Sequence, residues 1–139
     1  MFNFNSNKKN IFSNFKMHLG NNSNHRCSRN SRYIGDYEVI KQDDILEFLK
    51  DDIFILDVRT EKEFKGIRVK NAINLPLMIL SREIGSIVLD KDTKILIYCS
   101  TGERAMLAIQ KLNSLGYKNL YIWGNGGLNT LKCKDILEY

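Results

Sequence analysis

Three short runs of apolar residues constrain most strongly how this chain can fold. They are Ile53–Leu56, Ile95–Tyr98 and Leu120–Trp123. An uninterrupted apolar run of this length is typical of a strand that is covered on both faces, as in a parallel sheet. Segments with helical periodicity lie between the runs. We therefore expect an α/β fold, an open parallel sheet of about five strands with helices on both faces.

The remaining elements are weaker and are placed by their boundary residues. Two further short strands are expected over 37–40 and 72–75, and Pro76 stops the second of them. Asp43 or Asp44 is expected to cap a helix through Lys50, and Thr60 with Glu63 forms a capping box for a helix over 61–65. The other expected segments are a weak helix and loop over 77–89, a helix over 103–115 closed by Gly116, a loop over 124–127, and partial helix over 128–138.

Composition and charge separate the chain into two parts. The 139 residues carry a net charge of +5, but residues 1–35 hold six basic and no acidic residues, which leaves 15 basic and 16 acidic residues in 36–139. The domain itself is therefore not basic, and no nucleic-acid partner is expected. No apolar run approaches the roughly 18 residues of a membrane span, so no membrane partner is expected either.

Residues 1–35 are expected to be a disordered or leader segment, and residues 36–139 a single domain. The leader is rich in Asn and Ser and has few apolar residues, so it cannot bury a core. It is compatible with an organelle transit peptide, with a compositionally biased leader, or with an upstream start before Met17. A cytoplasmic location is the default expectation, with organelle targeting by residues 1–35 as the alternative.

The most informative segment follows the second apolar run. Cys99 comes directly after Tyr98, and Gly102 and Arg104 follow before a helical segment. Ligands of parallel sheets bind outside the carboxyl ends of strands, and N–H groups at a helix start bind anions. Such a position favours a thiolate, and the arginine adds a cationic fork for an oxyanion. The pattern predicts a nucleophilic cysteine facing an anion; the simpler alternative is an inert buried cysteine that ends a strand.

Cys99–Ala105 resembles the active-site loop of single-domain rhodaneses, Cys-x-x-Gly-x-Arg followed by a small residue. Four further segments resemble motifs of the same family in the same order. They are Leu56–Arg59 with Glu63–Phe64, Ala72–Pro76, Leu115–Tyr121 and Gly126–Leu128. The resemblance extends over about residues 37–132, nearly all of the part that is expected to fold.

The resemblance implies a sulfurtransferase. Cys99 would take the outer sulfur of thiosulfate, a mercapto acid or a persulfide, hold it as a cysteine persulfide, and pass it to a thiol or to cyanide. Arg104 would bind oxygens of the donor, and the loop N–H groups would stabilise the persulfide. The residues expected to bind or brace the donor site are Ser100, Thr101, Gly102, Glu103, Arg59 at its mouth, and Asp57 beside the loop. The implied partners are small sulfur donors and thiol acceptors, or another sulfur-carrier protein, with no cofactor and no metal.

Two alternatives remain open. Related phosphatases of this fold use a Cys-x5-Arg loop, whereas four residues separate Cys99 from Arg104 here. The shorter loop suits a sulfur atom better than a tetrahedral phosphate, which disfavours a small Cys-dependent phosphatase or arsenate reductase. A non-catalytic rhodanese-like binding module is the second alternative, and the retention of Cys99 counts against it.

The chain also departs from the family motifs. The family's Gly-His-Ile falls on Ile67–Val69, and its second glycine falls on Asn71. Glu103 is expected to offset the charge of Arg104, so a dianionic donor such as thiosulfate is expected to bind poorly. Cys133 has no motif around it and is read as incidental or as a resolving thiol. The three cysteines form no CxxC pair, which gives no zinc pattern.

Overall fold

The computed structural model describes residues 36–139 of the chain. The expectations for residues 1–35, a disordered segment or a targeting leader, lie outside these described residues and stay predictions. None of the helices between residues 36 and 139 combines the length and the apolar character that a membrane crossing requires.

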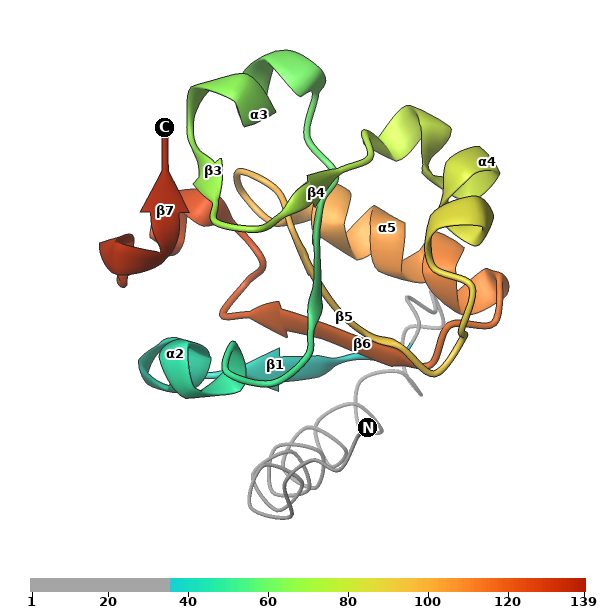
Figure 1. Cartoon of the computed structure of the whole chain (residues 1–139), viewed down its shortest axis with the longest axis horizontal. Helices are drawn as coiled ribbons and strands as arrows, with labels where there is room; N and C mark the ends of the chain where they lie inside the picture. Colours follow the sequence, from blue (N-terminus) through green and yellow to red (C-terminus); the bar gives the residue numbers. More distant parts are fainter. Residues whose placement is uncertain (1–35) are drawn as a thin grey trace, which may run out of the picture.

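A five-stranded parallel sheet forms the centre of the fold (Figure 1). Its order is β1-β6-β5-β2-β4, and every neighbouring pair is parallel. The strands are β1 (Glu38–Ile40), β2 (Phe54–Asp57), β4 (Ile73–Asn74), β5 (Lys94–Tyr98) and β6 (Asn119–Trp123). The expected α/β fold is confirmed, and the three apolar runs lie in the three central strands, where both faces are covered.

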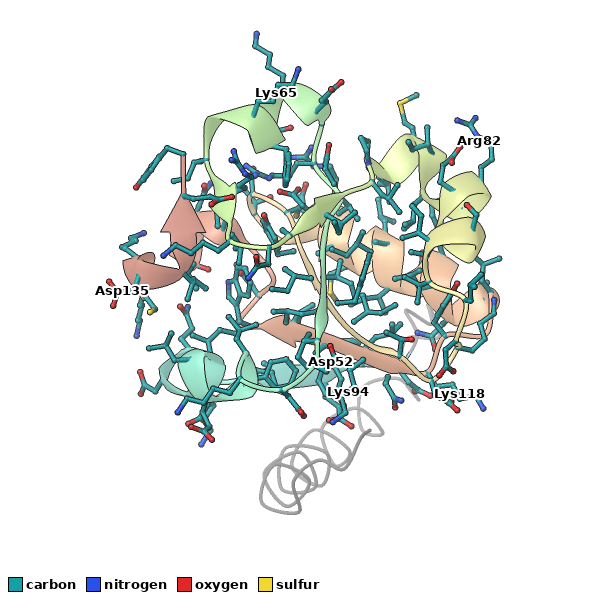
Figure 2. The ribbon with its side chains drawn as sticks, in the orientation of Figure 1. Asp52, Lys65, Arg82, Lys94, Lys118 and Asp135 are labelled. Carbon is teal, nitrogen blue, oxygen red and sulfur yellow. The ribbon has the colours of Figure 1, made fainter. Side chains whose placement is uncertain are left out.

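Helices follow most of the strands. The α-helices are α2 (Ile45–Phe48), α3 (Glu61–Gly66), α4 (Leu77–Ile87) and α5 (Glu103–Ser114). The short 3-10 helices are η1 (Gln42–Asp44), η2 (Leu128–Thr130) and η3 (Lys134–Ile136). Charged side chains such as Lys65 on α3 and Arg82 on α4 point away from the body of the domain (Figure 2).

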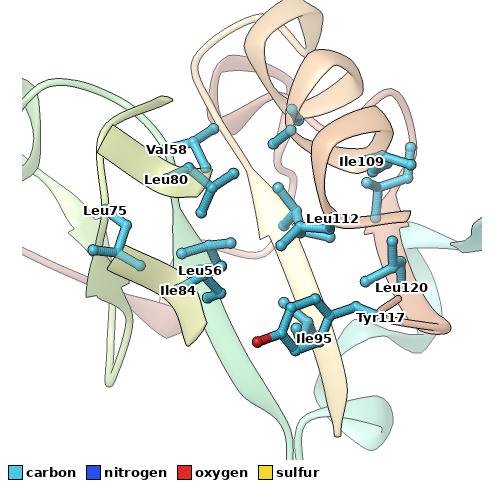
Figure 3. Packing of buried hydrophobic residues seen from close by; sticks show 14 of the residues in the cluster. Leu56, Val58, Leu75, Leu80, Ile84, Ile95, Ile109, Leu112, Tyr117 and Leu120 are labelled. Atoms are coloured by element: carbon cyan, nitrogen blue, oxygen red, sulfur yellow. The ribbon is translucent and has the colours of Figure 1, made fainter. Parts of the chain in front are cut away.

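The side chains of β5 alternate between two hydrophobic cores. Ile95 and Ile97 pack in one cluster with residues of α4 and α5, whereas Leu96 and Tyr98 pack in a second cluster on the other face with residues of α2 and η2. Figure 3 shows the first cluster, in which Leu112 of α5 and Ile84 of α4 pack over the sheet. Each fully buried leucine or isoleucine side chain contributes about 1.5–3 kcal/mol to the stability of the fold. This packing fixes the start of α5 beside the carboxyl end of β5.

The capping box predicted for α3 is confirmed. The Thr60 hydroxyl accepts a hydrogen bond from the Glu63 N–H at 3.2 Å, and the Glu63 carboxylate accepts one from the Thr60 N–H at 3.3 Å. Figure 1 shows α3 and the loop between β5 and α5 at the same end of the strands of the sheet. The cap therefore holds the Glu63 carboxylate near the loop that follows Cys99.

The C-terminal segment differs from its prediction. Residues 128–138 form the two short helices η2 and η3, and then β7 (Leu137–Glu138), which pairs antiparallel with β3 (Arg68–Val69). Each of these strands has two residues, so neither shows a periodicity that can be recognised. Their pairing depends on tertiary contact between distant segments of the chain.

Smaller differences concern helix ends. Residues 77–87 form a regular helix rather than a weak one, and Asp44 stands at the start of α2 without a side-chain capping bond. The helix expected over 103–115 ends at Ser114, so Leu115 follows the last helical residue, and it is 37% exposed. Asn71 has a φ of +68°, the left-handed conformation that asparagine tolerates better than most residues. It occupies the position where the resemblance places a family glycine.

Candidate active site

Cys99 lies where the first core cluster meets the carboxyl end of β5. The alternation of side chains along β5 puts Cys99 on the same face as Ile95 and Ile97, and the residue has no exposed surface. Its backbone forms a parallel bridge with Gly127. The sheet and α5 therefore fix the position of the sulfur from both sides.

The loop from Cys99 to Arg104 turns back on the sulfur. The Gly102 N–H donates to Cys99 Sγ at 2.9 Å, and the Ala105 N–H donates to it at 3.4 Å. Gly102 has a φ of +103°, and a Cβ there would overlap the carbonyl oxygen of Asn125. A glycine is thus required for both the turn and the close approach. The loop directs backbone donors at the sulfur, an arrangement that stabilises negative charge on it.

A second segment, residues 125–129, follows β6 and runs into η2, and it packs against the base of this loop. The Cys99 N–H donates to the Gly126 carbonyl at 2.9 Å, and the Leu128 N–H donates to the Cys99 carbonyl at 2.6 Å. The Asn129 N–H donates to the Ser100 carbonyl at 3.0 Å. The sequence prediction treats 124–127 as a loop without a role at the site. The paired glycines Gly126 and Gly127 are the signal that marks this close approach.

Arg104 makes a bidentate ion pair with Glu63. Its two terminal nitrogens each lie 2.9 Å from one carboxylate oxygen, NH1 from Oε2 and NH2 from Oε1. The side chains of Arg104 and Glu63 are 34% and 33% exposed. Glu103, which was expected to offset the charge of Arg104, is exposed in the first turn of α5. The carboxylate that contacts Arg104 belongs to Glu63. From the sequence, Glu63 was recognised as a helix cap and as part of a family motif, but not as the partner of Arg104.

The Glu63 carboxylate accepts hydrogen bonds from two segments of the chain, the start of α3 and the loop from Cys99 to Arg104. Oε1 also accepts a hydrogen bond from the Ser100 hydroxyl at 3.1 Å, and Oε2 accepts one from the Thr60 hydroxyl at 3.0 Å. The hydrogen bonds from Arg104, followed by those from Thr60 and Ser100, lower the pKa of Glu63 to about 2. The same contact with Glu63 raises the pKa of Arg104. Both groups therefore remain charged at neutral pH.

Asp57 and Arg59 form a second pair, which lies in the interior. Arg59 Nε and NH2 donate to the Asp57 carboxylate at 2.7–3.1 Å, and NH2 also donates to the Ile67 carbonyl at 2.7 Å. The Arg59 guanidinium lies 5.6 Å from the centre of the Tyr98 ring. Its side chain is 4% exposed, so the expectation that Arg59 lies at the mouth of the site is wrong. The side-chain hydrogen bonds of Asp57 go to Arg59 rather than to the Cys99 loop.

The structure thus brings together some of the predicted residues and separates others. The Gly102 N–H contacts the Cys99 sulfur, and Ser100 and Arg104 contact Glu63. Thr101 on the loop and Glu103 in the first turn of α5 are exposed. Among residues 36–139, no three His, Cys, Asp or Glu side chains are grouped so that they could hold a metal ion. Cys133 is partly exposed and packs against the second core cluster.

Comparison with known proteins gives one family. Residues 41–132 match the model of the rhodanese-like domain. The chain is 30% identical over 81 residues to thiosulfate sulfurtransferase PspE of Escherichia coli, an alignment that spans 58% of this chain and 76% of that protein. It is 32% identical over 66 residues to the adenylyltransferase and sulfurtransferase uba4 of Ogataea parapolymorpha, covering 48% of this chain but 17% of that protein.

Solved structures that resemble this chain belong to the same family. A rhodanese-related protein from Thermoplasma volcanium superposes with a TM-score of 0.57 at 31% identity, over 67% of this chain and 88% of that one. A thiosulfate sulfurtransferase from Pseudomonas aeruginosa superposes with a TM-score of 0.58 at 36% identity, over 65% of this chain and 17% of that one. In the larger relatives, the matching domain is therefore a small part of the protein.

Proposed function

Because the chain belongs to the rhodanese-like domain family, we propose that it is a sulfurtransferase that carries a sulfane sulfur as a persulfide on Cys99. Sulfurtransferase relatives at low identity support an activity of this kind at the level of the family. The donor and acceptor are small sulfur compounds and thiols, or a thiol on another sulfur-carrier protein.

One observation carries this proposal. Two backbone N–H groups, those of Gly102 and Ala105, donate to Cys99 Sγ at the start of the twelve-residue helix α5. Backbone donors and a helix start favour an anion at that place without any reorganisation. Such a site stabilises the thiolate before sulfur transfer and the persulfide anion after it.

The reaction consists of two balanced displacements. In the first, the Cys99 thiolate attacks the outer sulfur of a donor, the S–S bond of the donor breaks, and the remainder leaves with the bonding electron pair. With thiosulfate the leaving group is sulfite, and the product is a Cys99 persulfide anion. In the second, an acceptor thiolate or cyanide attacks the outer sulfur of the persulfide, and the Cys99 thiolate is regenerated.

The burial of Cys99 favours a second candidate. Since Cys99 has no exposed surface, a donor reaches Sγ only when the Cys99–Arg104 loop or the segment 125–129 that packs against it moves. A module that binds a partner through this loop and transfers no sulfur needs no such movement. The two candidates differ in whether a sulfur atom is ever attached to Cys99.

Mass spectrometry of the intact protein tests the proposal. After exposure to thiosulfate or to cysteine persulfide, the protein should gain the mass of one sulfur atom, and cyanide should remove it as thiocyanate. Cys99→Ala should abolish the gain, whereas Cys133→Ala should leave it intact as a matched control. If no donor places sulfur on Cys99, the binding module is the better description. Hydrolysis of p-nitrophenyl phosphate that outpaces sulfur transfer would instead indicate a phosphatase.

A further inference from the structure

Glu63 already occupies the groups that a donor anion would use. Both terminal nitrogens of Arg104 bind the Glu63 carboxylate at 2.9 Å, and the Ser100 hydroxyl binds it at 3.1 Å. An oxyanion that needs the Arg104 fork must therefore displace a carboxylate that belongs to the chain itself. A tethered carboxylate competes at a high effective concentration, so Glu63 has the advantage over a free oxyanion in binding Arg104.

The Glu63 carboxylate is also held from its own side. The Thr60 N–H and hydroxyl donate to Oε2 at 3.3 and 3.0 Å, and the capping box fixes the first turn of α3. With a pKa of about 2, Glu63 keeps its negative charge throughout the neutral range. The carboxylate is therefore a permanent anion beside the Cys99 loop.

The other arginines near α3 are engaged as well. Arg59 is bound by Asp57 and is 4% exposed. Arg68 donates to Glu138 at 3.0 Å and to the Phe64 carbonyl at 3.3 Å. Neither arginine offers a free fork that could replace Arg104 for an incoming dianion.

We infer that Glu63 is a specificity-determining residue, which selects against dianionic sulfur donors and favours donors that carry a single negative charge. The inference rests on the proposed sulfur transfer at Cys99. The backbone donors of Gly102 and Ala105 still receive the transferred sulfur, but the leaving part of the donor must be one that does not require Arg104. Persulfides and thiosulfonates are the chemical classes that meet this condition.

Thiosulfate and methanethiosulfonate form a matched pair of donors for the test. Both present an outer sulfur bonded to a sulfonyl sulfur, and they differ by one negative charge. With methanethiosulfonate, the Cys99 thiolate takes the outer sulfur, the S–S bond breaks, and methanesulfinate leaves with the electron pair. With thiosulfate, the same displacement releases sulfite. Cysteine persulfide serves as a third donor, which releases the cysteine thiolate and contains no sulfonyl group.

The experiment measures kcat/KM for each donor with cyanide as the acceptor. The wild-type protein should prefer methanethiosulfonate and cysteine persulfide over thiosulfate. Glu63→Gln keeps a residue that can cap α3 but removes the charge. It should raise kcat/KM for thiosulfate by about tenfold, mainly by lowering KM. For the other two donors, kcat/KM should change by less than about threefold. Glu61→Gln, on the exposed side of the same helix, should leave all three values unchanged.

Three outcomes separate the inference from the function on which it rests. If thiosulfate is the preferred donor of the wild-type protein, or if Glu63→Gln leaves the donor ratio unchanged, Glu63 does not set the specificity and the sulfur transfer itself stands. If Glu61→Gln shifts the ratio as much as Glu63→Gln does, the general charge of α3 is responsible and the inference is overturned. If no donor places sulfur on Cys99 in any of these proteins, the proposed function fails, and the inference fails with it.

Discussion

The pairs Asp57–Arg59 and Glu63–Arg104 are chemically alike, but they lie in different surroundings. The Asp57 and Arg59 side chains are 0% and 4% exposed, whereas those of Glu63 and Arg104 are 33% and 34% exposed. Each pair joins an arginine to a carboxylate through two or more hydrogen bonds below 3.2 Å. The difference between them is access to water.

Burial decides what each pair can do. A buried pair cannot open without leaving a charge in the core, so it is costly to break and acts as a fixed part of the fold. A pair that is one third exposed is screened by water and salt, and it contributes little to stability. Such a pair can be displaced by a ligand of matching charge. The comparison therefore assigns Asp57–Arg59 to the architecture and Glu63–Arg104 to the site.

The largest expected effect is on the buried pair. Asp57→Ala leaves the Arg59 guanidinium without its carboxylate in the core, so we expect the free energy of unfolding to fall by about 3–5 kcal/mol. Urea unfolding followed by circular dichroism measures it. Glu61→Ala removes an exposed pair with Lys65 and should cost less than about 0.5 kcal/mol. A loss below about 1 kcal/mol for Asp57→Ala would show that water reaches Arg59.

A double variant sharpens the interpretation of this loss. Arg59→Met alone leaves Asp57 buried, and Asp57→Ala alone leaves Arg59 buried. Because the double variant leaves neither charge behind, its loss should be smaller than the sum of the single losses by about 1–3 kcal/mol. Denaturant unfolding of the four proteins gives this coupling energy directly. Additive losses would mean that the two side chains stabilise the fold independently.

Thr60→Ala should have an intermediate effect. The Thr60 hydroxyl caps α3 and also donates to Glu63. Its loss should lower the free energy of unfolding by about 1 kcal/mol, the usual value of an N-cap. Thr60→Ser keeps the hydroxyl and should restore most of this. If the serine variant is as unstable as the alanine variant, the methyl group rather than the cap is responsible.

The smallest expected effect is on the exposed pair. Glu63→Gln should change the free energy of unfolding at neutral pH by about 0.5 kcal/mol or less. The pKa of Glu63 is lowered from 4.5 to about 2 in the folded protein, so its charge stabilises the fold fully above pH 4.5, and this contribution disappears as the pH falls toward 2. The stability difference between the wild-type and Glu63→Gln proteins should therefore shrink on acidification. A difference that grows as the pH falls contradicts the pairing with Arg104.

Much of the fold could be predicted from local patterns. The runs that became β2, β5 and β6 were recognisable because a strand covered on both faces is apolar at every position. The capping box of Thr60 and Glu63 was recognisable because both partners lie within one helical turn. The pair of β3 and β7 was not, since each strand has two residues and its partner lies about seventy positions away.

The candidate site likewise combines features that local sequence predicts with features that depend on tertiary contacts. The sequence by itself determined that Cys99 ends a buried strand, that Gly102 allows the turn, and that α5 starts next to them, because these are properties of consecutive residues. Tertiary structure alone decided that Glu63, 41 positions before Arg104, neutralises it, and that Arg59 turns inward to Asp57. Which carboxylate meets which arginine depends on how α3 packs beside the Cys99 loop, and that contact between distant segments leaves no trace in local composition or periodicity.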